Sequence, residues 1–185
     1  MPAKEQANHI LIMDAYYTIE EKYLQAVDEL AYGETSRGLK LLNEIISNDP
    51  AYARAHYQLG RIFYYDIKDY QAAGYHFQTC AELEPAFPDM YVPYLELLVF
   101  LDMEKKANGI AAKALTVAGV NTSAVYKQLG LMQEKHKDWG KALQAYRDAF
   151  MEVTDKEEHA DIDDCIARIK QKMQRSASYQ YHITE

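Results

Sequence analysis

The sequence predicts an all-α protein built from repeated helix pairs. Leu59-Gly60 recurs as Leu129-Gly130, 70 residues later, which corresponds to two periods of 35. Glycine and proline are scarce, with eight and five in 185 residues, as expected for long helices joined by short turns. Apolar residues make up 49% of the chain, which is enough to bury a core.

The first repeat is expected over residues 8–50. One long amphipathic helix is predicted over residues 8–32, followed by a turn at Gly33, a small residue at Gly38 and a stop at Pro50. The apolar side chains of this helix recur at steps of three and four: Ile12, Tyr16, Ile19, Tyr23, Val27 and Leu30.

The second and fourth repeats, over residues 51–86 and 121–154, match each other position by position. Lys68-Asp69-Tyr70 pairs with Lys137-Asp138-Trp139 at a separation of 69, so we expect one extra residue in the earlier turn, near Ile67. Asp69 and Asp138 are expected to cap the helices that follow them. The matched small residues mark close helix approach beside an aromatic residue: Gly60, Ala73 and Phe77 in one repeat, Gly130, Ala142 and Tyr146 in the other.

The third repeat, over residues 87–120, keeps Tyr91, Ala107 and Ala114, and Gly119 closes it. After the fourth repeat, Thr154-Asp-Lys-Glu157 predicts a capping box for a terminal helix over residues 155–175. A single apolar stripe on that helix is typical of a cap over the last repeat: Ile162, Ile166, Ile169 and Met173. Residues 176–185 are expected to be a mobile tail.

This pattern resembles the tetratricopeptide repeat, in which an aromatic residue, Leu-Gly, Tyr, Ala, a further aromatic residue, Ala and Pro recur every 34 residues. The second repeat carries it as His56, Leu59, Gly60, Phe63, Ala73, Phe77, Cys80 and Pro85, and the fourth as Tyr126, Leu129, Gly130, Ala142, Tyr146 and Ala149. The resemblance implies a right-handed superhelical array of about four antiparallel helix pairs, in a single domain over residues 1–175.

The resemblance also implies a concave groove lined by the first helix of each pair. It selects Arg54, Tyr57, Gln58, Arg61, Tyr64 and Tyr65 in the second repeat, Lys127, Gln128, Leu131, Glu134 and Lys135 in the fourth, and Asp89, Val92, Glu96, Val99 and Phe100 in the third. Arg54 and Arg61 lie seven residues apart on one helix face, where two guanidinium groups among phenols can hold a carboxylate. The alternative is a solvated face whose arginines pair with acids from neighbouring helices.

No catalytic motif, phosphate loop or zinc spacing is present, so the sequence predicts neither an enzyme nor a bound metal or cofactor. His159 and Asp163 stand one helical turn apart near other acids, but acids early and bases late in a helix are what the helix dipole favours. His56 is expected to pack in the core, and His76 and His136 to lie on the surface. Cys80 is expected in the core.

The formal charge of −8 disfavours nucleic acid and anionic membrane surfaces. Two unpaired cysteines fit a reducing compartment, so we expect a cytoplasmic protein. The favoured function is a scaffold or adaptor that binds a protein or peptide segment, acidic where Arg54, Arg61 and Lys127 face it. Self-association as a homodimer is the alternative, and a regulatory module that binds nucleic acid is the weakest hypothesis.

Overall fold

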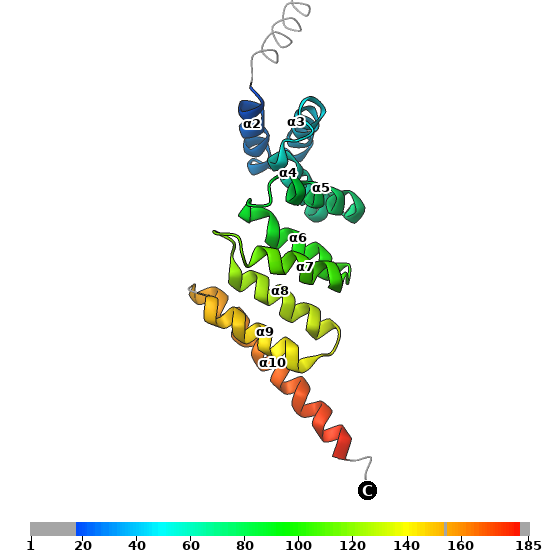
Figure 1. The fold of residues 1–185 in the computed structure, drawn as a ribbon, viewed down its shortest axis with the longest axis vertical. Helices are drawn as coiled ribbons and strands as arrows, with labels where there is room; N and C mark the ends of the chain where they lie inside the picture. The colour runs from blue at the N-terminus through cyan, green and yellow to red at the C-terminus, as the bar shows by residue number, and fades with distance from the viewer. Residues whose placement is uncertain (1–17, 154, 182–185) are drawn as a thin grey trace, which may run out of the picture. The chain divides into compact units, whose positions relative to one another are not determined.

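The computed structural model describes residues 18–153 and 155–181, and the chain divides into two compact units. Unit 1 is Met1–Glu84 and unit 2 is Pro85–Glu185. Every regular element in the described ranges is a helix, which confirms the all-α prediction (Figure 1).

Unit 1 contains two helix pairs. α2 (Ile19–Ala31) packs on α3 (Thr35–Asn48), and α4 (Ala53–Arg61) continues as the π-helix η1 (Ile62–Ile67) before packing on α5 (Tyr70–Leu83). Contacts between α3 and α4 join the two pairs. A shared core forms because both pairs turn their apolar stripes inward, with these residues buried: Ala26, Leu42, Ile45, Ala55, Leu59 and Ile62.

Unit 2 contains two further pairs and a last helix. A short 3₁₀-helix, η2 (Pro88–Met90), leads into α6 (Tyr91–Phe100), which pairs with α7 (Glu104–Ala114). α8 (Thr122–Lys135) packs on α9 (Trp139–Glu152), and α10 (Lys156–Tyr181) packs on α9 (Figure 1). Ile162, Cys165 and Ile169 of α10 close the core around Tyr146, as a terminal capping helix should.

A left-handed residue ends the first helix of every pair. Gly33 has φ 84°, Lys68 64°, Asp102 59° and Lys137 61°. Their spacings are 35, 34 and 35 residues, so the turn sets the register of all four repeats, including those whose sequence matches are weak. Five positions after each turn residue comes a small buried residue: Gly38, Ala73, Ala107 and Ala142.

The predicted close approaches are confirmed at two glycines. A Cβ on Gly60 would lie 2.7 Å from the ring of Phe77, and one on Gly130 would lie 2.7 Å from the ring of Tyr146. The predicted helix caps are also confirmed, since Asp69 accepts a hydrogen bond from the Ala72 amide and Asp138 from the Lys141 amide.

Several predicted boundaries are wrong. α2 begins at Ile19, because Thr18 is extended and forms a capping box with Glu21, so no single helix runs through residues 8–32. Residues 8–17, and Thr154 of the predicted capping box, lie outside the described ranges. Asp155 caps α10 by accepting from the Glu157 and Glu158 amides. The backbone of α10 also continues beyond the predicted end at residue 175, to Tyr181.

The extra residue of the second repeat lies inside a helix rather than in a turn. α4 and η1 together cover residues 53–67, whereas the equivalent α8 covers residues 122–135. The surplus residue widens the last turns of the helix into the π form, a local insertion that is often found at functional sites.

Candidate functional site

The predicted binding residues of unit 1 lie on α4 and η1, and both of their cations, Arg54 and Arg61, are exposed. The guanidinium carbon of Arg61 lies 5.7 Å from the centroid of the Tyr57 ring, within the range of a cation–π interaction. Tyr57 is buried, so it holds the arginine from below. No carboxylate of the described residues lies within ion-pair distance of Arg61, which leaves its charge available to a ligand.

Two further tyrosines follow on η1. The rings of Tyr64 and Tyr65 are 4.6 Å apart, and Tyr64 also meets Tyr70 of α5 edge to face at 6.1 Å. The side chain of Tyr65 is 39% exposed. The π-helix therefore carries two contacting phenols one turn beyond Arg61.

α2 adds a tyrosine that the sequence reasoning assigned only to packing. Gln58 of α4 donates a hydrogen bond of 3.4 Å to the hydroxyl of Tyr23, and Tyr23 lies 5.5 Å from the ring of Tyr52. Its place in the apolar stripe of α2 concealed this polar contact. We call the following set the tyrosine–arginine face: Tyr23, Tyr57, Gln58, Arg61, Tyr64 and Tyr65.

Arg54 has different partners. It lies 3.9 Å from a carboxylate oxygen of Glu84, which ends α5, and it lines a hollow of about 460 Å³ together with Glu20 and Asp49. For Arg54 the geometry fits the alternative of a solvated arginine paired with an acid of a neighbouring helix. The two-arginine clamp stays a prediction, in which Arg61 is the arginine with no acidic partner among the described residues.

In unit 2, the α10 helix covers much of the face predicted on α8. Lys127 forms an ion pair with Asp161 of α10. Glu134 accepts two hydrogen bonds of 2.9 Å from Arg168 and one of 2.6 Å from Lys172. These contacts leave Gln128 half-buried and Leu131 40% exposed on the face.

Glu134 is the most strongly held acid of unit 2. Hydrogen bonds from Arg168 and Lys172, with a further one from the Tyr146 hydroxyl at 2.8 Å, lower the pKa of Glu134 to about 2 against the cost of burial. Its side chain is only 9% exposed. The arrangement is structural, because every partner belongs to the helices that it joins.

The end of α6 is also held by α8. Lys135 donates to the carbonyls of Val99 and Phe100, at 2.6 and 3.2 Å, which satisfies the C-terminal groups of α6. Val99 is buried, so its predicted place on the binding surface is wrong: this short helix is apolar nearly all round. Phe100 is 54% exposed, and Val92 and Glu96 are half-buried. Asp89 is exposed in η2.

A buried histidine pair lies in unit 1. His56 and His76 approach at 3.0 Å between their Nδ1 atoms, and His56 Nε2 lies 3.1 Å from the Pro50 carbonyl. The carbonyl can only accept, so His56 donates from Nε2 and accepts at Nδ1 from His76. Burial, and then His56, lower the pKa of His76 to about 4. The predicted surface position of His76 is therefore wrong, whereas His56 is buried as predicted.

No group of three or more histidine, cysteine or acidic side chains gathers as a metal site within the described ranges. His159 packs edge to face on Phe150 with ring centroids 4.4 Å apart, and Asp161 is paired with Lys127. Both cysteines are free and buried, Cys80 on α5 and Cys165 on α10. Burial raises the pKa of the Cys80 thiol to about 12. No described helix combines the length and the apolar character needed to cross a bilayer.

Comparison with solved structures gives the same architecture. PilF of Pseudomonas aeruginosa superposes with a TM-score of 0.71 at 16% identity, over 88% of this chain and 72% of PilF. The fold is that of the tetratricopeptide repeat. MamA of Desulfovibrio magneticus RS-1, from its residue 41 to its end, gives a TM-score of 0.62 at 17% identity, over 85% of this chain and 96% of that fragment.

The tetratricopeptide-repeat domain of Arabidopsis OM64 gives a TM-score of 0.55 at 15% identity, over 64% of this chain and 94% of that domain. At these identities the likeness establishes the fold alone. No protein-family model matches the sequence, and no curated protein matches it.

Proposed function

We propose that the chain is a protein-interaction module, and that unit 1 binds an acidic segment of a partner protein on the tyrosine–arginine face. The observation that carries the proposal is Arg61, an exposed guanidinium held against Tyr57 with no carboxylate partner among the described residues. A pre-positioned arginine loses little side-chain entropy when it binds a carboxylate, and it can bind in bidentate fashion.

The tyrosines supply the remaining binding energy. Each phenol adds contact area at a low cost in conformational entropy, and its hydroxyl can bond to a peptide main chain. Tyr and Arg are also the residues that most often dominate binding energy at protein interfaces. The absence of a recognisable catalytic motif in the sequence favours binding over catalysis.

The test is selection of peptides from a random display library on the immobilised chain. We expect enriched peptides to carry Asp or Glu next to apolar residues. Arg61→Glu should weaken the binding of a selected peptide at least tenfold, or about 1.4 kcal/mol, because it removes a charge-assisted bond and adds repulsion.

Arg147→Glu is the matched control. Arg147 is exposed on α9 in unit 2 and has no ion pair among the described residues, so its reversal changes net charge equally. Failure to enrich acidic peptides, or equal losses of their binding from the two variants, would show that the tyrosine–arginine face is not the site.

A further inference from the structure

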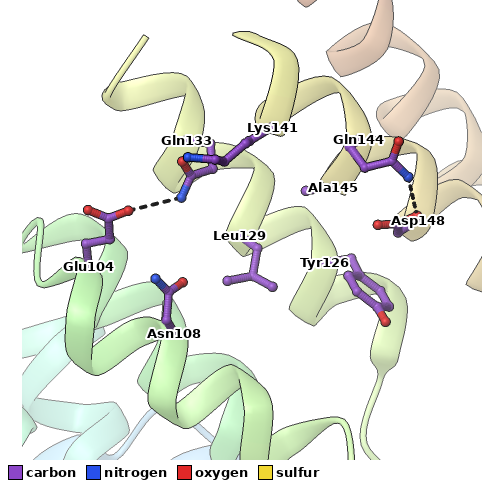
Figure 2. A pocket seen from close by; sticks show the side chains of 9 residues that line it. All are labelled: Glu104, Asn108, Tyr126, Leu129, Gln133, Lys141, Gln144, Ala145 and Asp148. Carbon is purple, nitrogen blue, oxygen red and sulfur yellow. Dashed lines mark hydrogen bonds between the residues drawn. The ribbon is translucent and has the colours of Figure 1, made fainter. Parts of the chain in front are cut away.

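A second hollow lies in unit 2, and none of its lining residues belongs to the tyrosine–arginine face. It is a groove of about 420 Å³, with α7 and α9 as walls and α8 as floor (Figure 2). Its walls are second helices of their pairs, whereas the tyrosine–arginine face lies on first helices. These residues line it: Glu104, Asn108, Tyr126, Leu129, Gln133, Lys141, Gln144, Ala145 and Asp148.

The charged groups at one end of the α7–α9 groove already have polar partners. Glu104 accepts a hydrogen bond of 3.2 Å from Gln133 and lies 3.2 Å from His136 Nδ1. Lys141 lies 2.8 Å from an oxygen of Asp138. A ligand gains little from charge at this end.

The other end holds an uncompensated carboxylate. Asp148 accepts a hydrogen bond of 2.9 Å from the neutral side-chain amide of Gln144. No cation of the described residues forms an ion pair with Asp148. Tyr126 lies at the same end of the groove (Figure 2). A carboxylate beside a phenol ring suits a Lys or Arg side chain, since the acid takes the charge and the ring takes the stem or the cation.

The middle of the groove suits a main chain. Leu129 and Ala145 give it an apolar base, and the side chain of Asn108 lies at the wall of α7 (Figure 2). Asn108 has no hydrogen-bond partner among the described residues, so its amide can donate to and accept from a peptide. From Tyr126 to Gln133 the helix rises about 10 Å, roughly the length of three extended residues.

We propose that the α7–α9 groove is a second binding site, and that it takes a short extended segment of a partner protein bearing a lysine or arginine. The cation binds Asp148 beside Tyr126, an adjacent apolar side chain covers Leu129 and Ala145, and Asn108 bonds to the main chain. The site is independent of the proposed function of unit 1, because it uses other residues and the opposite ligand charge.

The test is a titration of the ¹⁵N-labelled full chain with the capped pentapeptide Ala-Ala-Leu-Lys-Ala, followed by nuclear magnetic resonance. We expect the side-chain amide signals of Asn108 and Gln144 to shift, with a Kd on the order of 1 mM for so small a ligand. The same peptide with norleucine in place of lysine should bind about tenfold more weakly. Raised salt should weaken the lysine peptide selectively.

Asp148→Asn tests the charge without changing the shape, because asparagine can still accept the bond from Gln144. We expect about tenfold weaker binding from it and no change from Asp163→Asn, which removes an exposed acid of α10 that has no partner among the described residues. Ala145→Met, which fills the base of the groove without altering charge, should also abolish the shifts.

Equal binding of the lysine and norleucine peptides overturns the proposal. So does full binding by Asp148→Asn, or a set of shifted signals that lies outside the groove. If the groove signals instead move with protein concentration and no peptide, a second copy of the chain occupies the groove, and the proposal of a foreign basic segment is wrong.

Discussion

Each helix pair combines a small and a large side chain at two equivalent buried positions, one on each helix. In the first, third and fourth pairs, the residue seven positions before the left-handed turn residue is Ala26, Leu95 and Gly130. In the second pair, where η1 adds a residue, the equivalent residue is Gly60, eight positions before the turn residue. The residue nine positions after the turn varies in the opposite sense: Leu42, Ala111, Tyr146 and Phe77, respectively. All of these are buried, so each pair fills a similar space with a different division of volume.

Gly60→Ala is predicted to destabilise unit 1 by about 1 to 2 kcal/mol, because overpacking against the Phe77 ring exceeds the gain in helix propensity. Gly109→Ala is the control. Gly109 is also in a helix, but a Cβ added to it would meet no atom within 4 Å, so alanine there should stabilise by about 0.5 to 1 kcal/mol. Urea unfolding measures both, and a stabilising Gly60→Ala would contradict the packing account.

The close approaches at Gly60 and Gly130 could be predicted from the sequence, because a small residue and an aromatic residue recur together at a fixed spacing. The histidine pair could not. His56 and His76 are 20 residues apart, and a histidine is compatible with either a surface or a core position. Their burial depends on Phe63 stacking on the His76 ring and on the Pro50 carbonyl, which only the folded helix pair brings together.

At the scale of elements, η1 combines a structural irregularity with the proposed binding tyrosines. The surplus residue of this segment changes the angular spacing of the side chains that follow it, including those of Tyr64 and Tyr65. The sequence predicted the insertion from the change of period, but not its location. Whether a chain absorbs one residue in a turn or in a helix depends on packing at both ends, here Ile62 and the left-handed Lys68.

Deletion of Asp66, which is exposed in η1, is predicted to leave unit 1 folded with a regular α-helix in place of the π-helix. Binding of acidic peptides should fall several-fold because the tyrosines move. Deletion of His136, the C-cap residue of α8, should instead cost about 2 kcal/mol or more, because α8 has no surplus residue. Circular dichroism melts and backbone chemical shifts distinguish the two; comparable losses of stability would contradict the assignment of a surplus residue.

The apolar contacts of the capping helix α10 could be predicted from the sequence better than its polar contacts. Its predicted apolar stripe is confirmed at Ile162 and Ile169, which are buried, whereas Met173 is 38% exposed. Its polar contacts were not predicted, because Lys127 and Glu134 are more than thirty residues from the α10 side chains that they meet. A residue that would face a ligand in an open array instead faces the last helix.

At the scale of the whole molecule, the two units respond to different ranges of pH. His76 has a pKa of about 4 in folded unit 1 and an ordinary value of 6.5, so the unfolded chain binds the extra proton between these values. Unit 1 therefore loses stability as the pH falls from 6.5 to 4. Glu134 has a pKa of about 2 in folded unit 2 and an ordinary value of 4.5. Unit 2 therefore loses the stability contributed by ionised Glu134 only as the pH falls from 4.5 to 2.

We predict that lowering the pH from 7 to 5 weakens unit 1 by about 2 kcal/mol of the total of about 3 kcal/mol linked to His76, with almost no Glu134-linked loss in unit 2. Trp139, the only tryptophan of the sequence, reports unit 2 by fluorescence, and amide signals of α5 report unit 1. His76→Asn should remove the effect, because its amide can donate to His56 but does not titrate in this range. Equal weakening of that variant would assign the effect to another group.

Each unit contains one buried cysteine, and the rate at which that cysteine is alkylated reports the opening of its unit. Cys80 lies in unit 1 and Cys165 in unit 2, and neither thiol is exposed to a reagent while its helices are packed. Alkylation must therefore wait for a local opening, and when reclosing is fast its rate follows the population of the open form. Mass spectrometry of the two alkylated peptides would rank the opening of the units in a single sample of the unmutated chain.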